Sequence, residues 1–325
     1  MARKIDWEER VGRRLKLRDL HVYFTVVQCG SMAKAAIALG VAQPTVSEII
    51  ADLEHTFGVR LLDRVPRGVE PTMYGTALLK RGVAAFDELK QSTRDIEFLA
   101  DPTAGELKIG CAESIAAAVL PPIVERFERQ YPRVIINVDD VPSPAIGLLR
   151  DRKHDLIFAR IVRPRSDDDF NVETLFDDHL VVAAGRRSRW AGRRNIKLAD
   201  LLDTPWLLAP PDTWGYDRVA ETFNALGLNM PKVSLFTLSV HLRVHLLASG
   251  RFISAFPRSI ADQYGLKILP VDLPSRPWPV VMVTLRNRTL SPIVERFLEC
   301  AREVAKSTAN WARAQKPRTG KGIAA

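Results

Sequence analysis

The stretch from Ser31 to Ile50 most constrains the fold, because it predicts two short helices joined by a tight turn. Ser31 is a good N-cap residue, since its hydroxyl can accept hydrogen bonds from the free N–H groups of a first helical turn. Gly40 can adopt the left-handed conformation that ends a helix, and Pro44 is tolerated in the first turn of the next helix. We expect Val41 to be the buried residue of the turn.

The second helix carries an apolar stripe at helical spacing. The stripe consists of Val46, Ile50, Leu53 and Phe57. Two such helices indicate a helix-turn-helix, whose second helix lies in the major groove of DNA. The alternative is an ordinary helical hairpin in an all-α core. The cap, the glycine and the alanine-rich first helix together favour DNA binding.

Composition limits the class of protein. The chain has 325 residues, of which 46% are hydrophobic and 26% charged, as expected for a soluble protein of two or three domains. No apolar run is long enough to span a bilayer, and the N-terminus lacks the apolar core of a signal peptide, so we expect a cytoplasmic protein. Cys29, Cys111 and Cys300 lie far apart in apolar surroundings, which predicts buried free thiols.

The net charge of +9 suits a nucleic-acid-binding protein, but its distribution weakens that argument. Residues 302–325 contain six Lys and Arg against one Glu, so most of the basic excess lies in the last stretch. Local basic residues must therefore support the case for DNA binding.

One such group follows the helix-turn-helix. Residues 59–72 predict a two-stranded wing around the turn Pro66–Gly68. The wing carries Arg60, Arg64 and Arg67, which can reach the DNA backbone or the adjacent minor groove.

A long helix is predicted from Met73 to Ala100, which contains no proline. Its apolar stripe consists of Leu78, Ala85, Leu89, Ile96 and Leu99. A helix this apolar needs a partner, and its copy in a second subunit is the simplest one. The alternative is packing on its own domain.

The segment Asp101–Gly105 breaks this helix and marks the clearest domain boundary. Strands and helices alternate after it, which predicts parallel sheets with helices on both faces. The expected strands are Leu107–Cys111, Val134–Val138, Leu156–Ala159, Leu180–Ala184, Val233–Leu238, Phe252–Ala255 and Val280–Leu285. The expected helices are Ser114–Gln130, Ala145–Arg152, Tyr216–Leu226, His241–Ala248 and Pro292–Ala309. About 200 residues are many for one such sheet, so we expect two subdomains with a cleft, where ligands bind at the carboxyl ends of strands.

In this order, the pieces resemble the LysR-type transcriptional regulators. The N-terminal resemblance rests on Leu20, Phe24, Val27, Gly30, Ser31, Ala35, Ala36, Leu39–Val41, Gln43–Ser47, Leu53, Glu54, Phe57, Gly58, Leu61, Leu62, Arg64, Thr72 and Gly75. A looser resemblance rests on Gly105–Gly110, Leu120, Pro121, Phe127, Tyr131, Pro132, Asp155–Ile157, Ala248–Gly250, Phe256 and Pro257. Together these residues cover about residues 17 to 305.

The resemblance implies a multidomain α/β protein: an N-terminal winged helix-turn-helix, a long linker helix, and a C-terminal two-subdomain α/β effector domain of the periplasmic-binding-protein type. It also implies homodimers, often paired into tetramers, on double-stranded promoter DNA, with a small-molecule effector that changes the DNA geometry. The expected domains are an N-terminal extension (1–16), the winged helix-turn-helix (17–74), the linker and dimerisation helix with its hinge (75–104), the effector domain (105–312) and a disordered basic tail (313–325). Subdomain I is expected at about 105–162 and 275–312, and subdomain II at about 163–274.

The resemblance also assigns DNA-facing positions. Gln43, Pro44, Thr45 and Ser47 match the start of the recognition helix, Ser31 and Lys34 approach the backbone, and Arg64 matches the wing arginine. A glutamine amide can read adenine, and a threonine can contact a thymine methyl or a phosphate.

Three positions depart from the family pattern. Glu48 and Ala51 stand where many members have basic residues, and Ala42 replaces a serine that would cap the recognition helix. The helix also carries Asp52 and Glu54, so we expect the wing arginines to supply more of the salt-dependent affinity. Glu48 either accepts a hydrogen bond from a cytosine amine or is a neutral surface residue.

The candidate effector residues are Ser114, Ile115, Ser143, Arg160, Thr213 and Trp214. Ser114 opens a helix after the first strand, where free N–H groups suit an anion such as a carboxylate. Ser114 and Ser143 could equally be simple helix caps. Arg160 ends a strand at the cleft and could bind an acid, or form an ordinary ion pair. The sequence thus points weakly to an organic acid.

An enzyme is the main rival class, but the chain has no GxSxG, HExxH, P-loop or suitably placed GxGxxG motif. His241 and His245 lie four residues apart without an evident third metal ligand. We therefore expect no catalytic residues, no metal and no cofactor besides the effector. A constitutive DNA-binding repressor or architectural protein is the second alternative, although it would not need the α/β half.

Overall fold

A computed structural model describes residue 8 and residues 11–66, 68–143, 145–161, 169–274 and 276–314, with side chains described up to residue 306. The chain divides into two compact units, residues 1–90 and 91–325. Arg67, most of the predicted N-terminal extension, and residues 315–325 of the predicted tail lie outside the described residues.

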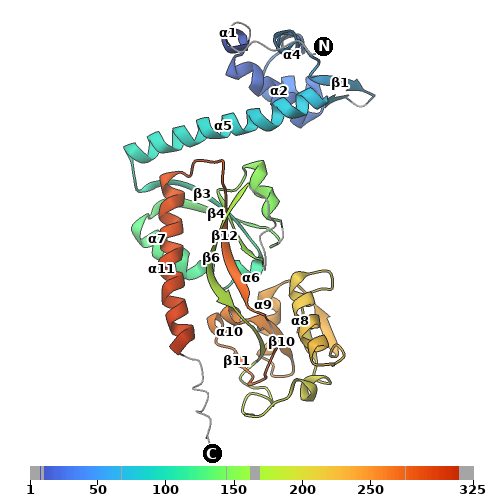
Figure 1. Cartoon of the computed structure of the whole chain (residues 1–325), viewed down its shortest axis with the longest axis vertical. Helices are drawn as coiled ribbons and strands as arrows, with labels where there is room; N and C mark the ends of the chain where they lie inside the picture. The colour runs from blue at the N-terminus through green and yellow to red at the C-terminus, as the bar shows by residue number, and fades with distance from the viewer. Residues whose placement is uncertain are drawn as a thin grey trace, which may run out of the picture. The chain divides into compact units, whose positions relative to one another are not determined.

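The first unit is a helix-turn-helix with a wing (Figure 1). It contains α1 (Gly12–Arg14), α2 (Leu17–Cys29), α3 (Met32–Leu39), α4 (Gln43–Phe57), β1 (Leu62–Val65), β2 (Gly68–Pro71) and the first part of α5 (Met73–Ala100). As predicted, the Ser31 hydroxyl accepts from the Lys34 N–H, and Gly40 adopts a left-handed conformation with φ of 66°. The expected burial of Val41 is wrong, because its side chain is 37% exposed.

The core of this unit lies where the helices cross. Tyr23 and Val26 of α2 pack with the apolar stripe of α4, and Ala35 of α3 is fully buried among them. Helix α5 packs closely on α2, since a Cβ at Gly82 would lie 2.2 Å from the Phe24 ring. A small side chain at each crossing is what allows these backbones to approach.

The second unit contains two five-stranded sheets, in the orders β4-β3-β5-β12-β6 and β11-β7-β10-β8-β9. The strands are β3 (Ala104–Cys111), β4 (Arg133–Asp140), β5 (Leu156–Arg160), β6 (Phe170–Asp178), β7 (Leu180–Ala184), β8 (Trp206–Leu208), β9 (Val233–Phe236), β10 (Ile253–Pro257), β11 (Lys267–Ile268) and β12 (Trp278–Leu285). The helices are α6 (Glu113–Ala116), α7 (Leu120–Gln130), α8 (Trp214–Ala225), α9 (Val240–Leu247), α10 (Arg258–Gln263) and α11 (Pro292–Ala314), with short 3-10 helices at Ile146–Asp151 and Leu198–Leu201.

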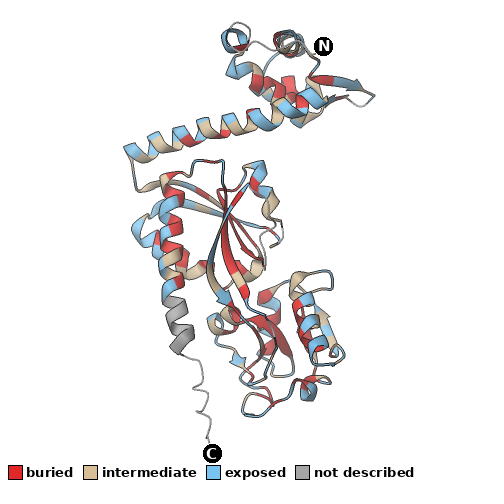
Figure 2. Ribbon diagram, in the orientation of Figure 1, coloured by how far each residue is buried: buried red, intermediate tan, exposed pale blue. Residues whose placement is uncertain are grey.

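The sheets are mixed, so the prediction of parallel sheets is wrong in part. Strand β3 runs parallel to β4 and β5, but β12 is antiparallel to β5 and β6, and β10 is antiparallel to β7. The reversed strands arise because β6 and β12 carry the chain from one sheet to the other and back. Figure 2 shows that buried residues concentrate on the central strands of both sheets.

The chain passes from the first sheet to the second within two residues. Asp178 ends β6 in the first sheet and pairs in register with Trp278, the first residue of β12. Leu180 begins β7 of the second sheet two residues later. The predicted second subdomain began at residue 163, whereas its pairing with β12 puts Phe170–Asp178 in the first sheet.

Two further sequence-based expectations concern thiols and membranes. Cys111 and Cys300 are free and buried, whereas Cys29 is free and only half-buried. Burial raises the pKa of the Cys111 thiol to about 12. Among the described helices, none alone has the length and apolarity to cross a membrane; the bent pair α3 and α4 meets that criterion by length and composition only.

Candidate DNA interface and effector cavity

The first turn of α4 presents the predicted recognition residues to solvent. Gln43, Pro44 and Glu48 are exposed, and Thr45 is half-buried. The N-cap residue Ala42 supplies no side-chain hydrogen bond. The N–H groups of this first turn therefore keep donor capacity for a phosphate.

The other predicted DNA-facing residues, in and next to α3 and α4, differ in their exposure to solvent. Lys34 is exposed, whereas Ser31 and Ser47 are half-buried. The Ser31 hydroxyl caps α3. The Ser47 hydroxyl donates a hydrogen bond to the sulfur of Met32 at 3.5 Å. Both hydroxyls thus also have a role within the protein.

The wing is held against the helix-turn-helix by a contact that sequence reasoning missed. One carboxylate oxygen of Glu54 accepts from the N–H groups of Leu61 and Leu62, at 2.7 and 3.2 Å. Glu54 was expected to add negative charge to the outer face of the recognition helix. It instead binds the start of the wing, leaving Glu48 and Asp52 as the exposed acids of α4.

The tip of the wing lies against the turn before α3. The Val69 N–H donates to the Gly30 carbonyl at 3.0 Å, and a Cβ at Gly68 would lie only 2.0 Å from that same oxygen. Because φ at Gly68 is 141°, a side chain there would also be strained. This close approach positions Arg60 and Arg64, both of which are exposed.

The second unit contains a cavity of about 240 Å³ between the two sheets. Five of the six predicted effector residues line it: Ser114, Ser143, Arg160, Thr213 and Trp214. Ile115, the sixth, does not line this cavity. Its side chain is fully buried in the core of the first sheet, because α6 turns it inward one position after Ser114.

The two serines bind Arg160 and do not cap helices. The Ser114 hydroxyl accepts from the Arg160 guanidinium at 3.3 Å, and the Ser143 hydroxyl accepts from the Arg160 backbone N–H at 3.2 Å. Ser114 lies within α6, whose N-cap is Ala112, and the 3-10 helix after Ser143 has Ala145 as its N-cap; neither alanine supplies a side-chain hydrogen bond.

Arg160 itself lies at the crossing between the sheets. Its guanidinium is 1% exposed and donates to Asp178 at 2.8 Å and to the Ser259 hydroxyl at 3.0 Å. The Ser259 hydroxyl donates in turn to the same Asp178 carboxylate at 2.6 Å. A buried ion pair thus joins the end of β5, the end of β6 and the start of α10. This is the ion-pair alternative considered for Arg160.

On the second sheet, Thr213 and Trp214 begin α8. The Thr213 hydroxyl accepts from the Tyr216 N–H as the N-cap, and donates to the Pro210 carbonyl at 2.6 Å. The Trp214 ring lies 6.2 Å from the Trp278 ring, centroid to centroid. The cavity therefore has an aromatic wall contributed by both sheets.

Among the cavity residues that sequence reasoning missed, Glu113, Arg243 and Trp278 carry charge or hydrogen-bond donors. Trp278 was missed because the predicted strand began at Val280, whereas the observed strand β12 begins at Trp278. Arg243 lies within an unremarkable helical pattern, and only the tertiary structure turns it toward the cavity. The Nε atoms of Arg160 and Arg243 and the indole nitrogen of Trp278 are buried, with no hydrogen-bond partner in the described part of the chain.

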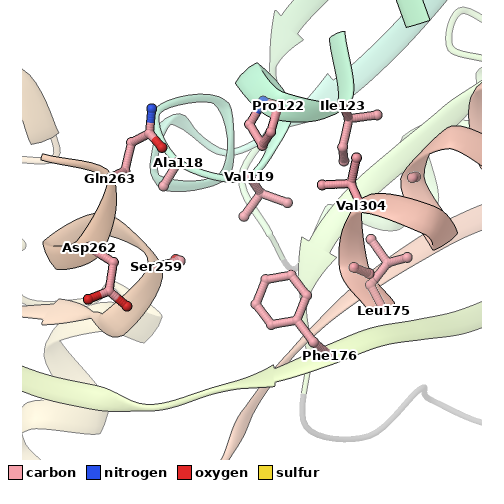
Figure 3. A pocket seen from close by; sticks show the side chains of 12 residues that line it. Ala118, Val119, Pro122, Ile123, Leu175, Phe176, Ser259, Asp262, Gln263 and Val304 are labelled. Carbon is pink, nitrogen blue, oxygen red and sulfur yellow. The ribbon is translucent and has the colours of Figure 1, made fainter. Parts of the chain in front are cut away.

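A second cavity, of about 260 Å³, lies elsewhere in this unit (Figure 3). Apolar side chains such as Val119, Phe176 and Val304 line one side, and Asp262 and Gln263 line the other. Burial raises the pKa of Asp262, although Arg258 at 3.2 Å opposes that shift. None of the predicted effector residues lines this cavity, and its wall contains no arginine.

Within the described ranges, no group of three or more His, Cys, Asp or Glu residues could hold a metal ion. His241 and His245 are both exposed on α9.

Comparison with protein families gives two matches. Residues 17–76 match the model described as "Bacterial regulatory helix-turn-helix protein, lysR family". Residues 100–306, which make up more than half of the chain, match the model described as "LysR substrate binding domain".

Curated relatives agree with these matches. The chain is 26% identical to the HTH-type transcriptional regulator GbpR of Azospirillum brasilense, over 86% of this chain and 83% of that protein. It is 25% identical to the HTH-type transcriptional regulator TdcA of Escherichia coli K12, over 77% of this chain and 80% of that protein.

Solved structures share the fold. A full-length OxyR variant from Pseudomonas aeruginosa aligns with a TM-score of 0.62 at 21% identity, covering 89% of this chain and 95% of that one. Full-length CbnR in complex with its target DNA aligns with a TM-score of 0.59 at 22% identity, covering 89% and 99%.

The helix-turn-helix match gives DNA as a partner of this chain, and the substrate-binding-domain match gives a small-molecule effector. The chain belongs to the LysR family and is a LysR-type DNA-binding transcriptional regulator with an effector-binding domain.

Proposed function

We propose that a small organic acid, bound in the cavity between the two sheets, controls promoter binding or DNA bending by this regulator. The observation that carries the proposal is the excess of buried donors. Arg160, Arg243 and Trp278 all line the cavity, and each has a buried nitrogen without an acceptor. A buried donor without an acceptor costs about 1–3 kcal/mol, and a carboxylate supplies acceptors.

We further propose that α5 is the dimerisation helix. Ile96 is 68% exposed and Leu99 is 81% exposed on this helix, which is more apolar surface than a solvated helix needs. A second copy of α5 would cover that stripe and bring two recognition helices to two half-sites of DNA. The regulator would then act in the cytoplasm, on the chromosome, without catalytic activity and without a cofactor besides the effector.

The test is a DNase footprint on the DNA upstream of the protein's own gene, recorded with and without a panel of organic acids. We expect protection at low salt, and a footprint that shortens or moves with at least one acid. Absence of any protection at low salt would contradict DNA binding at this site. A footprint that no acid changes would favour the constitutive DNA-binding protein.

A further inference from the structure

We propose that Arg243 anchors the effector, and that the effector is a small monoanion with an apolar body. This inference rests on the proposed control by an organic acid and specifies the chemistry of that acid. It also places the anchor at a residue other than Arg160, for which the sequence left acid binding and an ordinary ion pair open.

Arg160 already has its counter-ion. Its guanidinium and the Asp178 carboxylate are 1% and 2% exposed, and they lie 2.8 Å apart. Ser114 and Ser259 take two further guanidinium hydrogen bonds. The charge of Arg160 is therefore neutralised within the protein, and an anion would have to compete with a buried carboxylate for it.

Arg243 is buried without a counter-ion. The residue is 6% exposed, and in the described part of the chain it forms no salt bridge. One guanidinium N–H donates to the Ala255 carbonyl at 3.4 Å, and the group lies 4.4 Å from the centroid of the Phe256 ring. Neither contact balances a full charge, and Nε has no acceptor. A buried cation left in this state destabilises the unliganded protein.

Glu113 is the carboxylate whose charge acts on Arg243, but it is bound elsewhere. Its two oxygens accept from the Val240 N–H at the start of α9, at 2.7 and 2.8 Å. Burial still lowers the pKa of Arg243 to about 10 despite Glu113, so the guanidinium is cationic at neutral pH. An anion that enters the cavity would supply the missing charge and the missing acceptor together.

The rest of the wall limits the ligand to a single negative charge. Asp140 and Asp212 also line the cavity, and both are exposed. A second carboxylate directed toward them would meet like charge. Trp214, Trp278 and Val219 supply apolar surface for the body of the ligand. The volume of about 240 Å³ lies below the roughly 300–1,000 Å³ of common ligand pockets, which indicates a small molecule.

The first experiment needs no ligand. In the full-length protein, Arg243→Met is expected to raise the thermal midpoint, because it removes an uncompensated buried charge. Arg160→Met is expected to lower it, because Asp178 then stays buried without a partner. If Arg243→Met lowers the midpoint as much as Arg160→Met, Arg243 is a structural cation and the proposal is overturned.

The second experiment titrates the full-length protein with butyrate and benzoate, their neutral counterparts butyramide and benzamide, and the dicarboxylates succinate and isophthalate. Quenching of tryptophan fluorescence at constant ionic strength reports binding. We expect a monocarboxylate to bind saturably, and its amide and dicarboxylate counterparts to bind at least about tenfold more weakly. Arg243→Met should lose this binding, whereas the control Arg296→Met, on the exposed face of α11, should keep it.

Equal binding by acid and amide, no saturable binding by either monocarboxylate, or undiminished binding by Arg243→Met would each overturn the proposal. The footprint separates this failure from failure of the proposed function. A footprint that responds to an acid equally in the parent and in Arg243→Met refutes the anchor and leaves effector control intact. A footprint that responds to no acid refutes the effector control itself.

Discussion

Arg94 of α5 donates to the buried carboxylate of Asp155 at 3.0 Å. The same carboxylate binds Arg288 at 3.1 Å and accepts from the Lys108 N–H at 2.9 Å. Asp155 directly precedes β5, and Arg160 at the other end of that strand lines the cavity. Every residue of β5 is buried. The end of the linker helix and the effector cavity therefore contact opposite ends of one strand of the core.

The two arginines at Asp155 should differ in their effect on stability. Arg94→Ala should lower the free energy of unfolding by about 1 kcal/mol, because Arg288 and the Lys108 N–H still satisfy the carboxylate. Arg288→Ala should lower it by about 3 kcal/mol, because Arg288 is itself almost fully buried, so its loss removes a buried ion pair and also the donor that binds the His154 carbonyl. Urea unfolding followed by tryptophan fluorescence measures both. Equal losses would show that the two contacts are equivalent.

For Glu54 we expect a change in DNA affinity opposite to the one that its negative charge alone would predict. Glu54→Ala removes a negative charge from the recognition helix but also releases the wing, so it should weaken DNA binding and lower stability by about 1–2 kcal/mol. The matched control is Asp52→Ala, which removes an exposed acid of the same helix. Asp52→Ala should leave affinity equal or higher, since it reduces repulsion from phosphates. Gel shifts at fixed salt compare the two, and tighter binding by both variants would contradict a structural role for Glu54.

Arg64 is exposed on β1 and should contact the DNA backbone. Arg64→Ala should weaken binding to specific and unrelated DNA alike, and should reduce the slope of log K against log salt by about one. Arg296→Ala, an exposed arginine of α11, serves as the control for net charge. The measurement is a salt titration of affinity, and an unchanged slope would remove Arg64 from the interface.

Glu173 gives a prediction about pH. The bidentate contact from Arg302, at 2.8 Å to each oxygen, lowers the pKa of Glu173 below its ordinary value of 4.5. The pair therefore stabilises the fold above the unfolded pKa, and this contribution is lost as the pH falls through the lower, folded pKa. Because both side chains are partly exposed, Glu173→Gln should cost only about 0.5 kcal/mol at pH 7 and nothing in acid. Unfolding free energies at several pH values check this, with Glu125→Gln as the control. A cost that persists in acid would show that the carboxylate charge is not its cause.

The secondary structure around the DNA-binding motif was predictable because it depends on local chemistry. The Ser31 cap, the left-handed Gly40 and the helical stripe from Val46 to Leu53 act over one or two turns, and the structure has all of them. The long helix from Met73 to Ala100 also has its predicted bounds, because nothing in that stretch interrupts helical periodicity. The predicted burial of Val41 was wrong because it depends on which elements cover the turn.

The part of the effector cavity formed by the first sheet was the part that the sequence best predicted. Ser114 and Ser143 follow strands of the first sheet and Arg160 ends one, where the rule that ligands bind at strand ends applies. Ile115 does not line the cavity, because the short helix α6 directs its side chain into the core. Trp278 and Arg243 have no marker in the sequence, since their role depends on how the second sheet meets the first.

The family, the helix-turn-helix with its wing, and the break after Ala100 were all predictable from the sequence, because capping, helical spacing and turn chemistry are local properties. Three charged residues have roles that depend on tertiary contacts. Glu54 binds the wing, Arg160 is neutralised by Asp178, and Arg243 is left without a counter-ion. The physical reason is that a side chain's charge matters through the groups around it. Those groups lie outside the residue's own helical turn or strand: Leu61 and Leu62 are 7 and 8 positions from Glu54, and Asp178 and Ser259 are 18 and 99 positions from Arg160.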